Sequence, residues 1–148
     1  MHTLALAARL GPAVWIDLLR AVHELAIARY RLGSRAPQEL LLHARAPGSA
    51  NHPHRSSPDI ARLVDRVAYV VPRAAARVPW RADCLVQALA AQRWLGRKRI
   101  PTTFHIGLPT ESSDEFEAHA WLKHGEIVVT GGDLSGFVPL ERDEHLIN

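Results

Sequence analysis

The hydrophobic period of the chain changes near Pro101, and this change constrains the fold more than any other feature. Before it, apolar residues recur every three or four positions, as in helices that bury one face. After it, in TTFHIGL, Phe104, Ile106 and Leu108 alternate with polar or small residues, as in a strand. Helices followed by strands predict an α+β domain, in which an antiparallel sheet follows the helices.

Two amphipathic helices are predicted before residue 80. The first, between Pro12 and Gly33, has an apolar stripe from which Asp17 and Glu24 are excluded. The second begins after the capping sequence Ser-Pro-Asp at residue 57, because serine caps helices and proline fits the first helical position. We expect Pro72 to end or kink this second helix.

The strands after Pro101 include a predicted hairpin. The segment FEAHAWLKHGEIVVTGGD contains two apolar runs around His124 and Gly125, which we take as its turn. This register places His119 opposite Thr130. A further short strand is expected in the C-terminal segment LSGFVPLERDEHLIN.

Length and composition limit the classes of protein to which the chain can belong. Its 148 residues fit one domain, 1–148, which we divide into a helical part, 1–78, and a core, 79–148. No apolar run reaches the roughly 18 to 20 residues of a membrane span, and the N-terminus lacks the basic region of a signal peptide. One cysteine cannot form an internal disulfide. We therefore expect a cytoplasmic protein that does not enter a membrane.

Neither nucleic-acid binding nor metal binding is predicted. The net charge of +3 is spread over single arginines, without the aromatic and basic motif of a nucleic-acid-binding module. His52 and His54 form an H-x-H pair, but no cysteine or acidic cluster near them completes a metal site.

The single cysteine stands at the start of a third predicted helix, within RADCLVQALAAQRWLG. Asp83 is a good N-cap, which makes Cys84 the first helical residue. The helix dipole favours a thiolate there by about 0.3–1 kcal/mol, which is too little to activate the thiol alone. A nucleophilic Cys84 therefore needs a histidine. A cysteine in this position is also often only a small buried hydrophobic residue.

Among the nine histidines, His119 is the best candidate for this partner. It lies within a predicted strand between small residues, and a strand fixes the direction of a side chain better than a loop does. His105 is the second candidate. A catalytic imidazole also needs an acceptor on its other nitrogen. Asp133 is the candidate acceptor, because Gly131 and Gly132 allow the chain to bend back toward His119.

Two stretches, DCLVQALAAQRWLGRKRIPTTFHIGL and FEAHAWLKHGEIVVTGG, resemble the transglutaminase-like cysteine protease domain of lasso-peptide biosynthesis, the leader peptidase or B protein. The resemblance is close over residues 79–133. The chain departs from the family pattern at Lys98-Arg99-Ile100, where Arg-Gly-Ile is common, and at Lys123, where an acidic residue is common. The matching residues are Cys84, Leu85, Ala88, Leu89, Ile106, Gly107, Phe116, His119, Ala120 and Trp121.

The resemblance implies a transglutaminase-like, papain-like fold and a protease that removes the leader from a ribosomally made lasso-peptide precursor. Cys84, His119 and Asp133 would form its catalytic triad, without a cofactor or a metal. The segment before Cys84 lacks the β-rich pattern of a fused leader-recognition domain. The resemblance therefore implies a separate recognition protein as a partner, with the lasso cyclase as a further candidate.

Three other residues are candidates for substrate binding. Trp80 and Arg81 precede the nucleophile helix and are placed to line a peptide groove, although Trp80 could equally pack on that helix. Trp121 lies on the strand of His119, where it shields the imidazole or belongs to the core. Two other functions stay open, namely acyl transfer to an amine, as in transglutaminases, and a non-catalytic peptide-binding scaffold.

Overall fold

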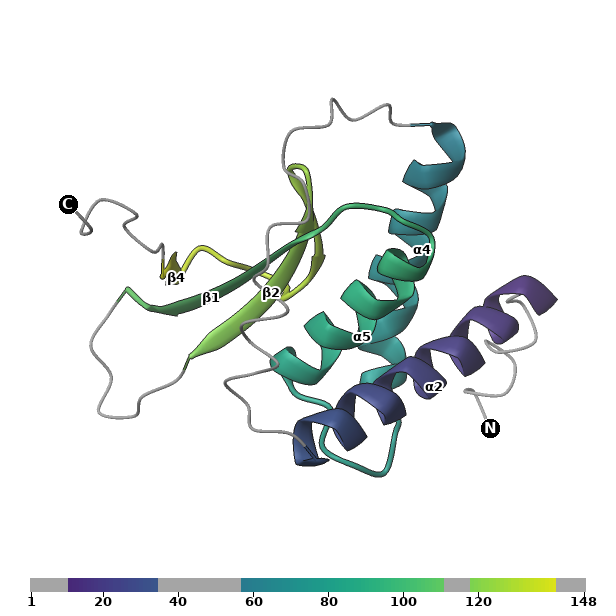
Figure 1. The fold of residues 1–148 in the computed structure, drawn as a ribbon, viewed down its shortest axis with the longest axis horizontal. Coiled ribbons are helices and arrows are strands. Elements are labelled where there is room, and N and C mark those ends of the chain that lie inside the picture. The colour runs from purple at the N-terminus through teal and green to yellow at the C-terminus, as the bar shows by residue number, and fades with distance from the viewer. Residues whose placement is uncertain (1–10, 35–56, 111–117, 141–148) are drawn as a thin grey trace.

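The computed structural model describes residues 11–34, 57–110 and 118–140 (Figure 1). In this part of the chain, three helices precede four strands, so the predicted α+β order is confirmed. The helices are α2 (Pro12–Ser34), α4 (Pro58–Ala75) and α5 (Cys84–Arg97). The strands are β1 (Thr103–Pro109), β2 (His119–His124), β3 (Ile127–Thr130) and β4 (Phe137–Pro139).

The four strands form one antiparallel sheet in the order β3-β2-β1-β4. The predicted hairpin forms, but its turn was placed one residue too early. His124 pairs with Ile127, so Gly125 and Glu126 make the turn, and the φ of 57° at Gly125 suits glycine at the first position of such a turn. A bulge between Leu122 and Lys123 shifts the register again. Thr130 therefore pairs with Leu122, and the predicted pairing of His119 with Thr130 is wrong. On its other side, β2 pairs with β1, where His119 lies opposite Gly107.

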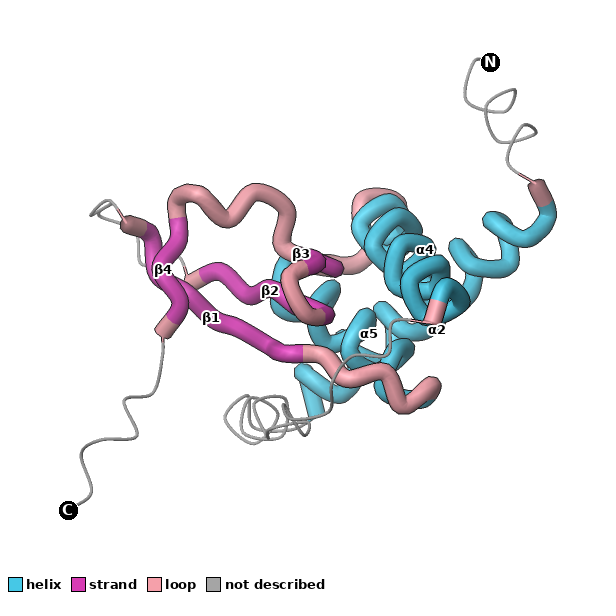
Figure 2. Tube along the Cα trace, turned by 90° about the horizontal axis from the view of Figure 1, so that it is seen from above, coloured by secondary structure: helices cyan, strands magenta, loops and turns pink. Residues whose placement is uncertain are grey.

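The helices and the sheet form two neighbouring layers, which Figure 2 shows side by side. Helix α5 packs against β2 and β3, and α4 packs against β3. Helix α2 packs on α4 and α5. Strand β4 lies at the far edge of the sheet from the helices (Figures 1 and 2).

The core lies between the helices and one face of the sheet. Phe104, Ala120, Leu122 and Val129 supply its strand side, and the apolar faces of α4 and α5 supply the rest. Successive side chains of a strand point to opposite faces of a sheet. The residues that alternate with this set on β1 and β2 therefore occupy the face that does not carry the helical core.

Helix α2 differs from its predicted pattern, because two acidic residues lie on its buried side. Glu24 is fully buried and Asp17 is 5% exposed. The sequence predicted that both residues lie off the buried stripe, and this was wrong. Both are buried because arginines of the other helices pair with their carboxylates. Arg66 of α4 donates two hydrogen bonds to Asp17, at 2.7 and 2.6 Å, and Arg93 of α5 donates one to Glu24 at 2.8 Å.

Helix α4 starts as predicted but continues further. Ser57 caps it by accepting a hydrogen bond from the amide of Asp59 at 3.2 Å, and Pro58 occupies its first turn. Pro72 does not end the helix, which runs on to Ala75. Because proline stands in the last turn, its missing N–H removes one hydrogen bond near an end that frays readily.

None of the helices in the described part of the chain is both long and apolar enough to cross a lipid bilayer.

Candidate active site

The start of α5 has the geometry that the sequence predicts. Asp83 is the N-cap and accepts a hydrogen bond from the amide of Val86 at 3.2 Å, so Cys84 is the first helical residue. Arg81 forms an ion pair with the other oxygen of Asp83 at 3.5 Å. The cap and this ion pair occupy the carboxylate that would otherwise oppose a thiolate next to it. The side chain of Gln87 donates to the carbonyl of Ala82 at 2.9 Å and ties the incoming chain to the helix.

Cys84 itself is half-buried and packs at the margin of the core. The first amides of a helix have no acceptor within the helix, so they can bind a negative charge beside this residue. Among the residues that the structure describes, the thiol makes no hydrogen bond.

His119 is the first residue of β2 and is held by a hydrogen bond and by stacking. Its Nε2 lies 2.7 Å from the carbonyl oxygen of Gly131. A carbonyl only accepts, so Nε2 carries the proton and, in the neutral ring, Nδ1 is left as the basic nitrogen. The imidazole stacks on Phe137 with 4.6 Å between ring centroids, and on Trp121 with 6.0 Å.

Trp121 is buried between close neighbours on the sheet face that carries His119. A Cβ atom added to Gly107 would lie 2.6 Å from the indole, so only glycine leaves space for the ring there. A Cβ atom at Gly131 would also collide with Trp121, and the φ of Gly131 is 116°. His105 stacks on the indole with 5.5 Å between centroids. Two imidazoles thus share one tryptophan.

His105, His119 and Trp121 form an aromatic cluster on the sheet. The sequence did not predict that Gly107, Gly131 and Phe137 would support it. A signal for Gly107 was present, because a glycine inside a strand often marks the close approach of another group. Nothing in the sequence indicated that Phe137 of β4 would reach the imidazole across the sheet.

Asp133 lies on the exposed loop between β3 and β4. Its Oδ1 accepts a hydrogen bond from the amide of Ser135 at 3.0 Å. The amide and the hydroxyl of Ser135 hold the pKa of Asp133 below its ordinary value. The acceptor on His119 is the carbonyl of Gly131, and the pairing of Asp133 with His119 stays a prediction.

Cys84 and His119 begin two elements that lie against each other. Helix α5 packs on β2, and in Figure 1 α5 starts near the middle of the view while β2 starts to its left. The alternation of β2 nevertheless turns Ala120 toward the helices and His119 toward the opposite face. The structure therefore groups His119 with Trp121, and the contact between the thiol and the imidazole stays a prediction.

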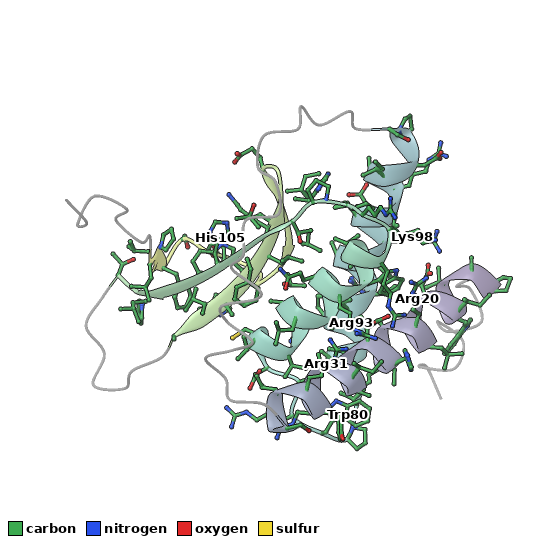
Figure 3. All side chains as sticks on the ribbon, in the orientation of Figure 1. Arg20, Arg31, Trp80, Arg93, Lys98 and His105 are labelled. Carbon is green, nitrogen blue, oxygen red and sulfur yellow. The ribbon has the colours of Figure 1, made fainter. Side chains whose placement is uncertain are left out.

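The two candidate residues before α5 lie in different surroundings. Trp80 is half-buried, and its buried Nε1 has no acceptor among the described residues. Figure 3 places it far from His105 and thus away from the aromatic cluster on the sheet. The side chain of Arg81 is 81% exposed and contacts Asp83.

In the described ranges, no group of three histidine, cysteine or acidic side chains is arranged to hold a metal ion. The H-x-H pair of His52 and His54 lies outside these ranges.

Comparison with known proteins agrees with the fold. No curated protein and no solved structure matches the chain at a significant level. The family model of the Transglutaminase-like superfamily matches residues 22–142, which include all three helices in part or whole, the four strands and the residues Cys84, His119 and Asp133. A match over this much of the chain shows that the protein belongs to the transglutaminase-like superfamily.

Proposed function

We propose that this protein is a cysteine peptidase that removes the leader from a lasso-peptide precursor. The observation that carries the proposal is the position of the single cysteine in a transglutaminase-like chain. Cys84 is the first residue of α5, which packs on the strand that begins with His119. The sequence pattern around both residues, CLVQAL and HAW, supports the leader-peptidase branch of this chemistry.

In the proposed mechanism, Nδ1 of His119 takes the proton of the Cys84 thiol. The thiolate attacks the scissile carbonyl, and the C–N bond breaks as an acyl-enzyme forms and the imidazolium gives its proton to the leaving amine. Water then hydrolyses the thioester and releases the leader as an acid. In this proposal, free amides at the start of α5 would stabilise the oxyanion. This route requires the thiol and Nδ1 to come within about 3 Å of each other when the precursor binds.

The proposed substrate and partners follow from the same resemblance. A separate recognition protein would bring the leader to the peptidase, and the lasso cyclase would receive the released core. The net charge of +3 suits an acidic partner or leader.

The test searches the genes next to that of this protein for a small precursor and a recognition protein, and combines any that are found with the full chain. Mass spectrometry should detect the leader and the core as separate products with the wild type. We expect the Cys84→Ala variant to give no cleavage, because no other thiol exists in the chain. Thermal unfolding at the wild-type temperature would show that the variant is folded. Cleavage by Cys84→Ala at the wild-type rate would overturn the assignment.

Acyl transfer to an amine is the second candidate, because the superfamily takes its name from that reaction. It shares the acyl-enzyme and differs in the group that accepts the acyl chain. A labelled primary amine added to the same reaction separates the two. Incorporation of label into the leader identifies a transferase, and a free leader acid identifies a peptidase.

A further inference from the structure

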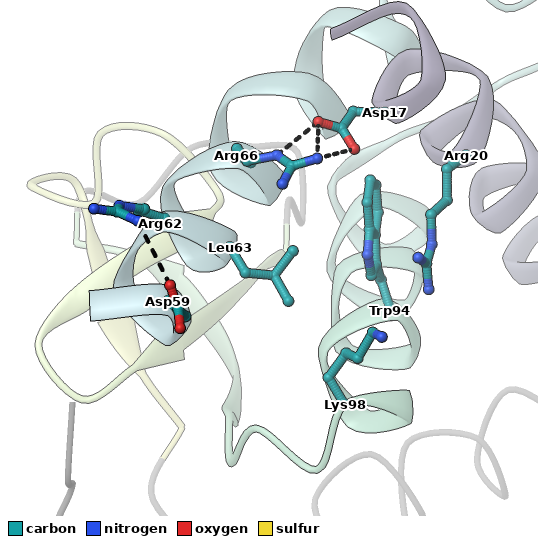
Figure 4. A pocket seen from close by; sticks show the side chains of 8 residues that line it. All are labelled: Asp17, Arg20, Asp59, Arg62, Leu63, Arg66, Trp94 and Lys98. Atoms are coloured by element: carbon teal, nitrogen blue, oxygen red, sulfur yellow. Dashed lines mark hydrogen bonds and ion pairs between the residues drawn. The ribbon is translucent and has the colours of Figure 1, made fainter. Parts of the chain in front are cut away.

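A second site lies among the three helices, away from Cys84. An open pocket of about 470 Å³ is lined by residues of α2, α4 and α5 together with Lys98, the C-cap of α5 (Figure 4). Trp94, which lines it, follows Cys84 by ten residues of one helix. At 1.5 Å per residue, the two positions are about 15 Å apart along the axis. The pocket is therefore independent of the proposed peptidase chemistry.

The pocket has more positive than negative charge. Its lining contains four cations and two carboxylates, which leaves a formal excess of two positive charges. Arg66 is held by Asp17, as described above, and Arg62 forms an exposed ion pair with Asp59 at 3.5 Å. Arg20 and Lys98 are the other two cations, and neither has a carboxylate partner among the described residues.

Both carboxylates that line the pocket already face arginines of α4. Both oxygens of Asp17 already accept bonds from Arg66. Trp94 is 1% exposed, and its buried Nε1–H has no acceptor among the described residues. Arg20 lies over the indole, 4.8 Å from its centroid, and adds further N–H donors. Apart from the second oxygen of the exposed Asp59, the groups in this pocket that lack partners are donors and cations, which suit a ligand with several acceptor oxygens.

The two remaining lining surfaces are apolar. Figure 4 shows Leu63 on one side of the pocket and the indole of Trp94 on the other. A ligand with an organic part can cover the half-buried Leu63 while its charged group meets Arg20 and Lys98. Pockets of this size commonly hold small molecules.

We propose that this pocket binds a small organic molecule that carries a phosphate group. A phosphate monoester has a charge of about −1.5 to −2 near neutral pH and three strong acceptor oxygens. It therefore matches the two excess positive charges better than a carboxylate, which has a single charge. Arginine and lysine are the side chains that bind phosphate most often by charge-assisted hydrogen bonds.

Isothermal titration calorimetry with phenyl phosphate tests the proposal on the full chain, in an amine buffer without phosphate. We expect saturable binding of one molecule per chain, weaker binding of inorganic phosphate, and weaker binding of benzoate than of either. Added salt should reduce the affinity, because the contacts are ionic. Absence of saturable binding, or benzoate binding as tight as phenyl phosphate binding, would overturn the proposal.

Matched variants locate the binding. Lys98→Gln and Arg20→Gln should each weaken phenyl phosphate binding by about tenfold, because each removes a charge-assisted contact. Arg31→Gln makes the same charge change near the C-terminal end of α2, outside the pocket (Figure 3), and should leave the affinity within about twofold of wild type. An equal effect of all three would show that net charge, and not the pocket, binds the anion.

Discussion

At the scale of single residues, the position of His119 depends on a glycine that no other residue can replace without strain. Gly131 supplies the carbonyl that accepts from Nε2, has a φ of 116°, and leaves no space for a side chain beside Trp121. One residue thus fixes the tautomer of the imidazole and the packing of the indole. Positions of this kind are common where a fold holds functional groups in place.

Gly131→Ala should therefore destabilise the protein and disturb His119. Backbone strain and the collision with Trp121 together should lower the free energy of unfolding by about 2 kcal/mol or more. Gly132→Ala is the matched control, because Gly132 has a φ of 65° but nothing within 4 Å of its added Cβ. Urea denaturation compares the two, and equal losses would contradict the role given to the contact with Trp121.

A measurement of the Asp133 pKa distinguishes two causes of its shift, namely the hydrogen bonds from Ser135 and an interaction with His119. Because the pKa is lowered in the folded state, the Ser135 hydrogen bonds stabilise the fold above the ordinary pKa of aspartate. This contribution is lost as the pH falls through the lowered value. An NMR titration should find the lowered pKa partly restored in Ser135→Ala. A rise only in His119→Ala would show instead that the imidazolium faces the carboxylate.

At the scale of elements, buried ion pairs join the helices. Glu24 of α2 is fully buried and meets Arg93 at 2.8 Å and Arg97 at 3.2 Å, both on α5. A buried ion pair of this kind adds little to the free energy of unfolding, because burying the charges is costly. Removing one partner is strongly destabilising, because it leaves the other charge buried and unpaired. The pair therefore fixes how α2 is placed on α5 more than it strengthens their contact.

Arg93→Met should destabilise the protein by about 3 kcal/mol, because it leaves Glu24 buried with only the longer contact to Arg97. The double variant Glu24→Leu/Arg93→Met should recover most of this loss, since it replaces the pair by apolar groups. Lys123→Met, which removes an exposed pair with Glu126 at 3.6 Å, is the control and should change stability by less than about 1 kcal/mol. Chemical denaturation measures all three. A double variant no more stable than Arg93→Met would contradict this account.

The errors in the predicted elements have physical causes. Asp17 and Glu24 were assigned to a solvated face because acidic residues usually lie there, and their arginine partners stand 49 and 69 positions away in sequence. The hairpin register was wrong by one residue because both His124-Gly125 and Gly125-Glu126 fit a two-residue turn. The caps at Ser57 and Asp83 were predicted correctly, because capping depends only on neighbouring residues.

At the scale of the whole molecule, local pattern predicted the elements and long-range packing decided the site. The change of period near Pro101 was enough to predict helices followed by an antiparallel sheet. The two-residue period of β2 also puts His119 and Trp121 on one face. The packing of α5 against β2 decides which face of the strand meets the helices. The sequence period does not indicate which of the two faces this is. The relation between the thiol and the imidazole therefore needs a measurement.

The most direct measurement is the rate at which iodoacetamide modifies Cys84 near neutral pH, which mass spectrometry can follow without ambiguity in a chain with one thiol. A thiolate reacts and a thiol does not, so an imidazole that takes the proton raises the rate. We predict that the wild type reacts at least about tenfold faster than His119→Ala. His23→Ala, an exposed histidine of α2, should react like the wild type. An inert Cys84, or equal rates in the wild type and His119→Ala, would contradict the assignment of this cysteine as a nucleophile activated by His119.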